Sequence, residues 1–579
     1  MAHRTFSSIL IANRGEIAAR VVRTAKRLGL RTIAVFTEPD RHAPHVRSCD
    51  EAVGVASYLD IASILRAPGE AVHPGYGFLA ENPAFAEAVI AAGRAWVGPS
   101  PAAMRAFGDK ANAKRLAAKA GVPVLPTYEG KPEFPLVIKA LAGGGGRGMR
   151  LVRSAKDLDA ALASAKSEAE HAFGDGRLLL EKAVLAPRHV EVQVFADAHG
   201  RVVHLGERDC SVQRRHQKLV EESPAPGVDA KLRAKLGEAA IAVARAAKYT
   251  GAGTVEFLLD ASGAFWFIEA NARLQVEHPV TEAVTGLDLV EWQLRVAAGE
   301  PLPLAQEDIG FDGHAIEARL CAEDPAQDFL PQTGRLALWK PSPDVRVDHA
   351  LESGMEITPH YDSLLAKLIA HAPTRDAARA KLAAALDATL ALGFPTNKAY
   401  LAAVLRDEVF AKGKATTDLL ADRFGGWKPP AVDEAFARRL YAAARAASAG
   451  YGEWGGWSSL GRAERAEAPH ALDGATLHFA RDGQSFSWRD PTLDPPAKRA
   501  AGFDGRSLAA PMNARVVAVH AKPGDAVSQG SALVVLEAMK MEHTLAAPAD
   551  LRVTAVHVAR GAQVAPGKVL MEFETGGTP

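Results

Sequence analysis

Five polar residues alternate with small or apolar ones near the middle of the chain, and their types could bind both a cation and an anion. They are Glu269, Asn271, Arg273, Gln275 and Glu277. On an extended chain, alternate side chains point to the same side. We therefore expect one face that carries two carboxylates, two amides and a guanidinium.

A further carboxylate precedes this row, in the apolar run 254–259. If Ser262-Gly263 forms a two-residue turn, Glu256 lies directly opposite Glu269. Side chains in that relation have Cβ atoms about 4.5–5.5 Å apart, where like charges repel. A divalent cation would relieve this repulsion, and two carboxylates with the amide of Asn271 suit Mg²⁺. The alternative is a surface hairpin with two solvated glutamates.

A glycine run, residues 143–146 followed by Arg147 and Gly148, comes after an apolar strand that ends at Lys139. Backbone N–H groups in such a run can surround an anion, and Lys139 could reach phosphate oxygens. The run is not a P-loop, because no Gly-Lys-Ser/Thr follows it. A mobile surface loop is the alternative interpretation.

Lys540 stands between two methionines in a segment that repeats itself. Residues 515–520 recur as residues 552–557, a shift of 37 without a gap, and four glycine or apolar positions recur at the same shift. Both halves alternate apolar and polar residues between glycines, which predicts short strands and turns. We expect a flattened barrel of two four-strand halves, with Lys540 as an attachment point on a hairpin tip. The alternative is an ordinary solvated lysine.

Composition predicts an ordinary soluble protein of several domains. The chain has 579 residues, 48% hydrophobic and 23% charged, and its 68 basic residues balance 68 acidic ones. This balance argues against nucleic-acid binding, and no stretch is apolar enough to span a membrane. Three dispersed cysteines indicate a reducing compartment, and Cys210 is expected to be a buried structural residue. A strand and helix starting at residue 7 leave no room for a signal peptide, so we expect a cytoplasmic protein.

Two parts of the sequence resemble biotin-dependent carboxylases. Ala538-Met539-Lys540-Met541 matches the biotinylation signal of the biotinyl carrier domain. Residues 5 to about 425 resemble the biotin carboxylase component, an ATP-grasp fold, through segments that follow one another in order. These segments are 11–18, 73–79, 108–110, 187–191, 207–211, 213–218, 271–279 and 361–364.

The resemblance implies an α/β plus all-β architecture. The expected parts are an N-terminal open α/β domain, an ATP-grasp lid and core, a C-terminal α+β domain, a short docking region, a linker and the biotinyl barrel. Their expected ranges are 5–105, 106–300, 301–424, 425–492, 493–506 and 507–575.

The resemblance also implies roles for individual residues. ATP would be bound by Lys110, Lys139, Gly144, Gly145, Gly146, Glu181, Lys182, Val184, His189, Gln213 and His216. Mg²⁺ or Mn²⁺ would be held by Glu256, Glu269 and Asn271. Bicarbonate would be bound by Lys218, Arg273, Gln275 and the amide of Val276. Glu277 would deprotonate bicarbonate, Arg346 would stabilise the biotin enolate, and Tyr76 would contact biotin.

These features predict the biotin-bearing subunit of an acyl-CoA carboxylase, with 3-methylcrotonyl-CoA favoured over acetyl-, propionyl- or geranyl-CoA. A carboxyltransferase subunit and a biotin protein ligase are the expected partners, so a hetero-oligomer is expected. Two alternatives remain: a non-catalytic biotin carrier with a degenerate ATP-grasp domain, and a ligase that joins bicarbonate to an amine.

Overall fold

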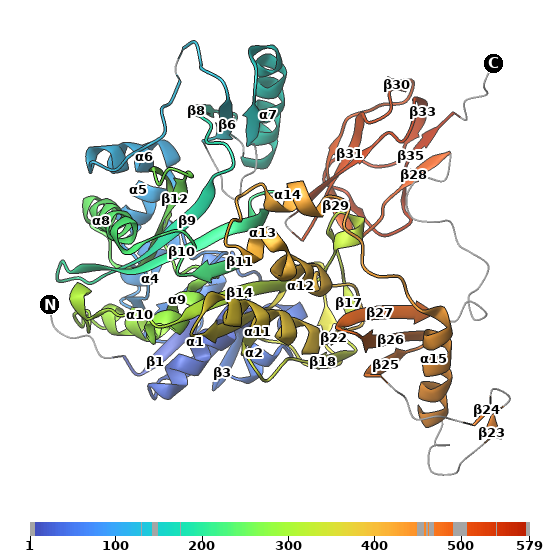
Figure 1. Ribbon diagram of the computed structural model, residues 1–579, viewed down its shortest axis with the longest axis horizontal. Helices are drawn as coiled ribbons and strands as arrows, with labels where there is room; N and C mark the ends of the chain where they lie inside the picture. Colours follow the sequence, from blue (N-terminus) through green and yellow to red (C-terminus); the bar gives the residue numbers. More distant parts are fainter. Residues whose placement is uncertain are drawn as a thin grey trace.

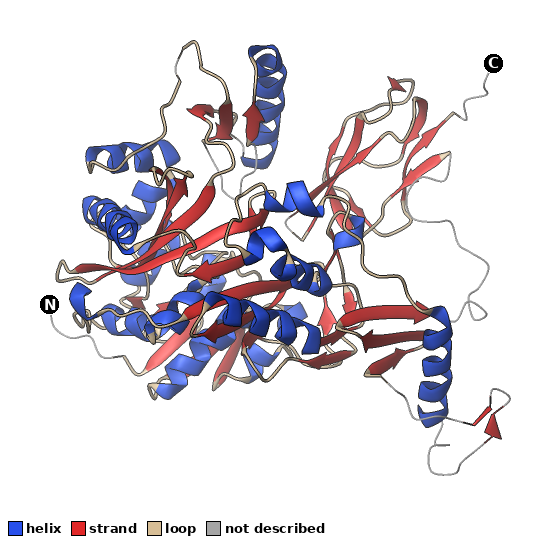
Figure 2. Ribbon diagram, viewed as in Figure 1, coloured by secondary structure: helices blue, strands red, loops and turns tan. Residues whose placement is uncertain are grey.

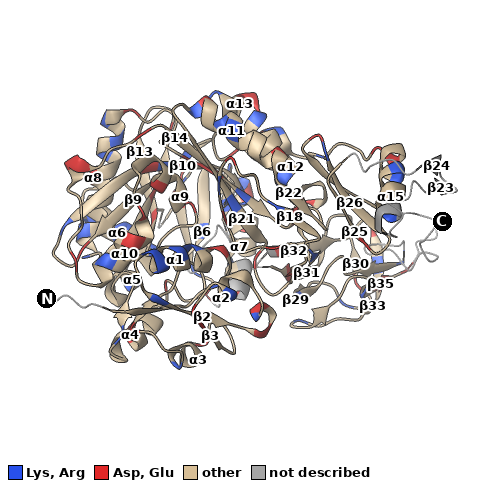
Figure 3. Ribbon diagram, turned by 90° about the horizontal axis from the view of Figure 1, so that it is seen from below, with Lys and Arg blue, Asp and Glu red and all other residues tan. Residues whose placement is uncertain are grey.

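The computed structural model describes residues 6–128, 130–141, 149–173, 175–448, 457–458, 461–462, 468–489, 506–539 and 541–574. Within these ranges, no helix is long and apolar enough to cross a membrane. Helices cover sheets in the larger body, whereas the C-terminal part consists of strands (Figure 2). Basic and acidic residues are interspersed along the ribbon (Figure 3), as their equal numbers suggest.

The N-terminal region is an open parallel sheet with the strand order β3-β2-β1-β4-β5. Its first strand and first helix lie where the sequence predicted them, at β1 (Ser8–Ile11) and α1 (Gly15–Arg27). The other strands are β2 (Arg31–Phe36), β3 (Glu51–Gly54), β4 (Ala71–His73) and β5 (Ala95–Trp96). The β1 strand is buried along its whole length, as expected for the centre of a parallel sheet.

An eight-stranded sheet forms the centre of the molecule, in the order β13-β12-β9-β10-β11-β14-β21-β19 (Figure 1). Every pair in it is antiparallel. Because the sheet runs without a break from the ATP-grasp region into the C-terminal region, it fixes the two relative to each other. Its strands are β9 (Arg188–Ala196), β10 (Val202–Arg214), β11 (Gln217–Ser223), β12 (Gly251–Leu259), β13 (Phe265–Asn271), β14 (His314–Cys321), β19 (Arg346–His349) and β21 (Leu364–Ala372).

A small separate layer stands above this sheet in Figure 1. It consists of a three-stranded sheet, β7-β6-β8, and one helix with its own small core. The elements are β6 (Leu136–Ala140), β7 (Arg150–Val152), β8 (Leu178–Lys182) and α7 (Leu158–Phe173). This layer corresponds to the lid that the sequence predicted.

The C-terminal region ends in helices, and a small sheet with one helix follows it. Helices α11 (Arg375–Ala388) and α12 (Lys398–Arg406) precede α15 (Glu434–Ser448). The small sheet is a hairpin of β26 (Thr476–Arg481) and β27 (Gln484–Arg489), joined by β25 (His470–Asp473). Phe436, Leu440 and Tyr441 of α15 pack against Phe479 and Trp488 of this sheet.

The C-terminal barrel shows the internal repeat in three dimensions. Its two sheets have the orders β28-β35-β33-β30 and β32-β31-β29-β34, so equivalent strands occupy equivalent places. The bulge between Val516 and Ala518 recurs between Val553 and Ala555. Each sheet combines two strands from each half, which interlocks the halves. The strands are β28 (Ser507–Ala509), β29 (Ala514–Val519), β30 (Ala526–Val527), β31 (Ala532–Ala538), β32 (Met541–Ala546), β33 (Leu551–Val556), β34 (Gln563–Val564) and β35 (Val569–Phe573).

The β12–β13 hairpin has the predicted pairing, but the turn between its strands differs from the predicted one. Glu256 lies opposite Glu269, as expected. The prediction of a two-residue turn at Ser262-Gly263 was wrong, because pairing ends at Leu259 and Phe265. A bulge next to Glu256 compensates for the longer turn and restores the register.

Candidate active site

Lys218 on β11 lies at the centre of a buried cluster of charges. Its ammonium donates to Glu191 Oε2 at 2.6 Å, Glu277 Oε1 at 2.6 Å and Glu256 Oε1 at 3.0 Å. Burial opposes the charge of Lys218, but the three carboxylates outweigh burial and hold its pKa well above the ordinary value. Lys218 is therefore a fixed cation at neutral pH.

Glu277 is the carboxylate that the sequence predicted as a base. Its second oxygen accepts from Arg319 Nη2 at 2.9 Å, and its side chain is buried. Burial alone would raise its pKa, but Lys218, Arg319 and Arg208 together hold the pKa well below its usual range. Glu277 is therefore ionised at neutral pH and can accept a proton from a bound anion.

The segment between β13 and the next helix differs from the expected extended chain. The strand ends at Asn271, and α9 (His278–Thr285) begins directly after Glu277. The predicted side chains still converge: Asn271 donates to Glu256 Oε1 at 2.8 Å and Gln275 donates to it at 3.2 Å. A turn, rather than strand alternation, brings Glu277 into the site.

Glu256 and Glu269 meet the main chemical requirement of a metal site. In the described part of the chain, the side chain of Glu269 makes no hydrogen bond or ion pair. Burial and the neighbouring charge of Glu256 raise the pKa of Glu269. Glu256 is held by His189, whose Nε2 lies 2.6 Å from Glu256 Oε2. A divalent cation between the two carboxylates would remove their repulsion, so the residues present fit the predicted Mg²⁺.

On the lid side of the site, Glu181 joins two lysines. Lys139 lies 2.6 Å and Lys114 lies 2.5 Å from its carboxylate. Lys114 was not predicted from the sequence, because a lysine one helical turn after Lys110 carries no motif. Lys182 ends strand β8, and its amide donates to Pro126 O at 3.0 Å.

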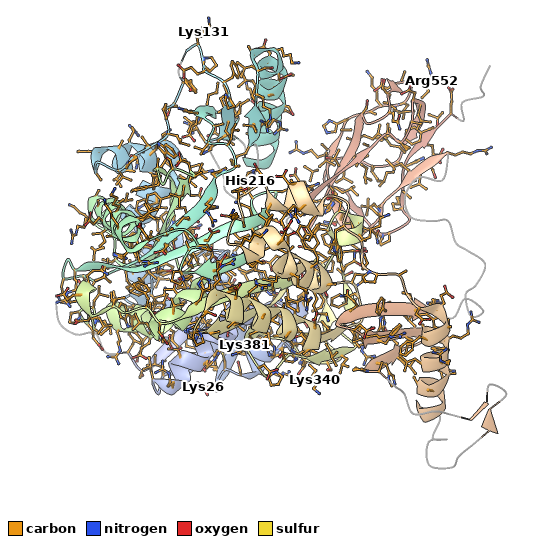
Figure 4. The ribbon with its side chains drawn as sticks, viewed as in Figure 1. Lys26, Lys131, His216, Lys340, Lys381 and Arg552 are labelled. Carbon is orange, nitrogen blue, oxygen red and sulfur yellow. The ribbon has the colours of Figure 1, made fainter. Side chains whose placement is uncertain are left out.

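The remaining predicted nucleotide residues that the structure describes lie on β10, in the turn after it, at the start of α6 and after β8. Gln213 approaches His189 Nδ1 at 3.5 Å, and His216 lies in the β10–β11 turn below the lid (Figure 4). Lys110 begins α6 (Lys110–Lys119) and acts electrostatically on both Glu269 and His216. Val184 follows β8 and is half-buried. Gly144, Gly145, Gly146 and Lys540 lie outside the described residues.

Three hydrogen bonds position the predicted bicarbonate residues. Arg273 donates to Gln275 Oε1 at 2.8 Å and to Glu81 Oε2 at 2.9 Å. The carbonyl of Val276 accepts from the buried Lys367 at 2.8 Å. Val276, whose amide is predicted to bind the anion, is therefore held through its carbonyl. Tyr76 lies near this lysine, with its ring centre 5.8 Å from Lys367 Nζ.

Arg346 is placed apart from the residues that contact Lys218. It forms ion pairs of 2.7 Å with Glu282 and with Asp348. The arginine that contacts Glu277 is Arg319 on β14, which also pairs with Glu221. Sequence reasoning missed Arg319. Its alternation with Glu317 on a strand was the available signal, but only the sheet order brings β14 next to β11.

Behind the site, Glu191 and Arg208 form a fully buried ion pair of 2.6 Å. Cys210 is buried, as predicted, and lies close to Glu191 and Glu277. Burial and the nearby carboxylates raise the pKa of its thiol well above the ordinary value. Cys210 is therefore a neutral thiol that packs beside the site.

Comparison with known proteins agrees with this geometry. Residues 5–104 match the biotin carboxylase N-terminal domain, and residues 109–305 match the ATP-binding domain of the carbamoyl-phosphate synthase L chain. Residues 317–422 match the biotin carboxylase C-terminal domain, and residues 506–573 match the domain of biotin-requiring enzymes.

Some similar proteins are matched over almost their whole length, and others are longer than the matched region. The biotin carboxylase of Nostoc sp. is 46% identical over 442 residues, which cover 72% of this chain and 99% of that protein. The mitochondrial methylcrotonoyl-CoA carboxylase subunit alpha of Rattus norvegicus is 47% identical over 442 residues, 72% of this chain and 62% of the relative. The match thus spans less than two thirds of that longer relative.

A solved structure of the same kind has the same fold. The biotin carboxylase domain of Hydrogenobacter thermophilus 2-oxoglutarate carboxylase, in complex with MgADP, ADP and bicarbonate, has a TM-score of 0.72 and 42% identity. The match covers 74% of this chain and 100% of that domain. The chain belongs to the biotin carboxylase family of biotin-dependent carboxylases, and its C-terminal barrel is a biotinyl domain. The family and fold predicted from the sequence are confirmed.

Proposed function

We propose that this chain uses ATP and bicarbonate to carboxylate a biotin attached to its own Lys540. It would act as the biotin-bearing subunit of an acyl-CoA carboxylase. The observation that carries the proposal is Glu277, an ionised buried carboxylate held by Lys218 and Arg319 beside the Glu256–Glu269 pair. A base, two cationic groups and a metal-binding pair are thus present on the chain that also has the carrier domain.

Each of these residues has its own role in the proposed reaction. Glu277 takes the proton of bicarbonate, which turns a poor nucleophile into one that can attack the γ-phosphate of ATP. ADP leaves, and the carboxyphosphate that forms breaks down to CO₂ and to phosphate, which takes the proton of the ureido nitrogen. Arg273 and Lys218 hold the anion, while Lys139 and Lys110 offset the charge of the phosphates. Mg²⁺, when bound at Glu256 and Glu269, supplies further charge neutralisation for phosphoryl transfer.

Arg319 is better placed than Arg346 to act on the reacting groups, because it already contacts Glu277. We therefore add Arg319 to the proposed site and retain Arg346 as a predicted residue with its own ion pairs. Biotin, when attached, supplies the ureido nitrogen that takes up CO₂.

The partner and the acyl-CoA are part of the proposal. The matched relatives include methylcrotonoyl-CoA carboxylase alpha subunits, which supports 3-methylcrotonyl-CoA as the first candidate. A separate carboxyltransferase subunit would accept the carboxyl group, and a biotin protein ligase would modify Lys540. A cytoplasmic location stays a prediction.

Bicarbonate-dependent ATP hydrolysis, measured with and without free biotin, tests the function. The proposal predicts hydrolysis that requires bicarbonate and rises with biotin. A non-catalytic carrier would show neither. Intact mass after co-expression with a biotin ligase should show one biotin, which is lost in Lys540→Ala; a biotinylated Lys540→Ala protein would contradict the attachment site.

A further inference from the structure

A tight loop of the C-terminal region lies between the nucleotide hairpin and the biotinyl barrel. It connects β15 (Glu323–Asp324) to β16 (Leu330–Pro331), which pair with each other. Two consecutive residues in it, Asp328 and Phe329, have positive φ values of 51° and 60°. Non-glycine residues rarely adopt this conformation, and it costs on the order of 1–3 kcal/mol per residue unless contacts enforce it.

The contacts that enforce this conformation come from the β10–β11 hairpin. Arg214 Nη2 donates to the carbonyl of Asp328 at 2.6 Å and to its carboxylate at 3.0 Å, and Arg215 donates to the same carboxylate at 2.8 Å. The Arg214 guanidinium also lies 4.2 Å from the ring centre of Phe329, which is buried against Tyr400. The loop is thus fixed to the hairpin and to the core.

The next residue of the loop faces the barrel. Leu330 packs against the barrel core, the cluster that includes Leu533, Val534 and Leu536 of β31. This is a contact between regions far apart in the sequence, and Figure 1 shows the barrel to the right of the central sheet. Leu330 is therefore an apolar contact between the carboxylase region and the carrier.

A second contact involves the strand that follows the attachment lysine. His543 on β32 is three residues beyond Lys540, and its buried Nε2 has no hydrogen-bond partner within the described ranges. Burial and then the charges of Arg214 and Arg215 lower the pKa of His543, while Asp328 opposes them. The attachment side of the barrel thus lies within electrostatic reach of the hairpin tip.

The same hairpin carries predicted site residues. Gln213 and His216 flank the two arginines, and Lys218 follows on β11. One short loop therefore binds the nucleotide hairpin through Asp328 and the carrier through Leu330. We propose that the loop from Asp324 to Pro331 is the seat of this chain's own biotinyl barrel during carboxylation. The inference rests on the proposed function and adds the surface that brings the carrier to the site.

Attached biotin and free biotin, used as two substrates, distinguish an effect on the seat from an effect on the chemistry. The biotinylated full-length chain is assayed for radiolabel transferred from bicarbonate to its own biotin, and for bicarbonate-dependent ATP hydrolysis with saturating free biotin. Leu330→Asp should lower the transfer to the attached biotin roughly tenfold, because a charged side chain replaces the half-buried leucine in the apolar contact. Hydrolysis with free biotin should stay within twofold of wild type.

Asp328→Asn is the second variant, since it weakens both arginine pairs and keeps Leu330. It should also lower the attached-biotin rate more than the free-biotin rate. Leu59→Asp, at a leucine whose surface is 61% exposed and which lies in the N-terminal domain, is the matched control and should change neither rate.

Unchanged transfer to attached biotin in Leu330→Asp would overturn the seat, and an equal loss on both substrates would overturn it in favour of a general structural role. Rescue of labelling in Leu330→Asp by an added Lys540→Ala chain, which has an intact loop and site but no biotin of its own, would show that the seat accepts a barrel from a second copy, and would contradict the assignment to the same chain. If the wild-type chain shows no bicarbonate-dependent hydrolysis, the proposed function fails before the seat is tested.

Discussion

At the residue scale, the site is governed by how charges offset one another in a buried volume. Lys218 contacts three carboxylates, and Glu277 contacts two cations. Each charge is stabilised by its partners, so the removal of one leaves another uncompensated. Substitutions such as Glu→Gln, which remove a charge but keep the size of the side chain, therefore test the role of each charge.

Glu277→Gln should lower bicarbonate-dependent ATP turnover by about 10²–10⁴-fold, because the amide cannot accept the proton. Nucleotide affinity should be nearly unchanged, since the contacts of Glu277 are with Lys218 and Arg319. Steady-state turnover and nucleotide binding are measured side by side. Turnover within a few-fold of wild type would remove Glu277 from the mechanism.

Glu269→Gln should raise the Mg²⁺ concentration needed for half-maximal ATP hydrolysis steeply. The glutamine removes one of the two facing carboxylates and so weakens the attraction for the cation. A magnesium titration at saturating ATP checks this, with Glu87→Gln as a control at an exposed carboxylate that pairs with Arg105 in the N-terminal domain. Identical magnesium curves for Glu269→Gln and wild type would count against the metal site.

At the scale of elements, sequence patterns predicted the strands well and the turns poorly. The 37-residue repeat predicted both halves of the barrel, because alternation and glycine spacing are local signals. The pairing of Glu256 with Glu269 was correct, but a longer turn and a bulge cancel to produce it. Arg319 and Lys367 escaped prediction because their contacts with Glu277 and Val276 depend on the order of strands in the sheet.

The buried pair of Glu16 and Lys367, next to the carbonyl of Val276, gives a prediction about pH. Glu16 on α1 is buried beside Lys367, whose Nζ lies 3.2 Å away, and burial raises the pKa of Glu16 to about 7 despite this lysine. The folded state therefore binds the proton more tightly than the unfolded state does. The resulting stabilisation is present below the ordinary pKa of 4.5 and is lost as the pH rises to about 7.

Glu16→Gln removes this titration, so the variant should gain stability relative to wild type as the pH rises. The gain between pH 5 and 8 should be on the order of 3 kcal/mol, given 1.36 kcal/mol per pKa unit. Calorimetric unfolding temperatures of both proteins across this range provide the measurement. A constant difference between the two temperatures would contradict the raised pKa.

At the scale of the whole molecule, the continuous eight-stranded sheet fixes the relative positions of the ATP-grasp region, which carries Glu277, and the C-terminal region, which carries Arg319. Family resemblance predicted this architecture from ordered motifs. The position of the barrel against Leu330 could not be predicted, because a long Pro- and Ala-containing stretch separates the carrier from the docking region. That contact depends on surface complementarity, for which the sequence has no periodic signal.

The most direct test follows the carboxyl group through the complete chain. Biotinylated protein is incubated with ATP, Mg²⁺ and radiolabelled bicarbonate, and the label bound to the protein is counted. We expect label on the wild-type chain, none on Lys540→Ala, and a rate of labelling reduced about 10²–10⁴-fold in Glu277→Gln. A wild-type chain that carries biotin but acquires no label, or a Lys540→Ala chain that is labelled as fast as wild type, would contradict it.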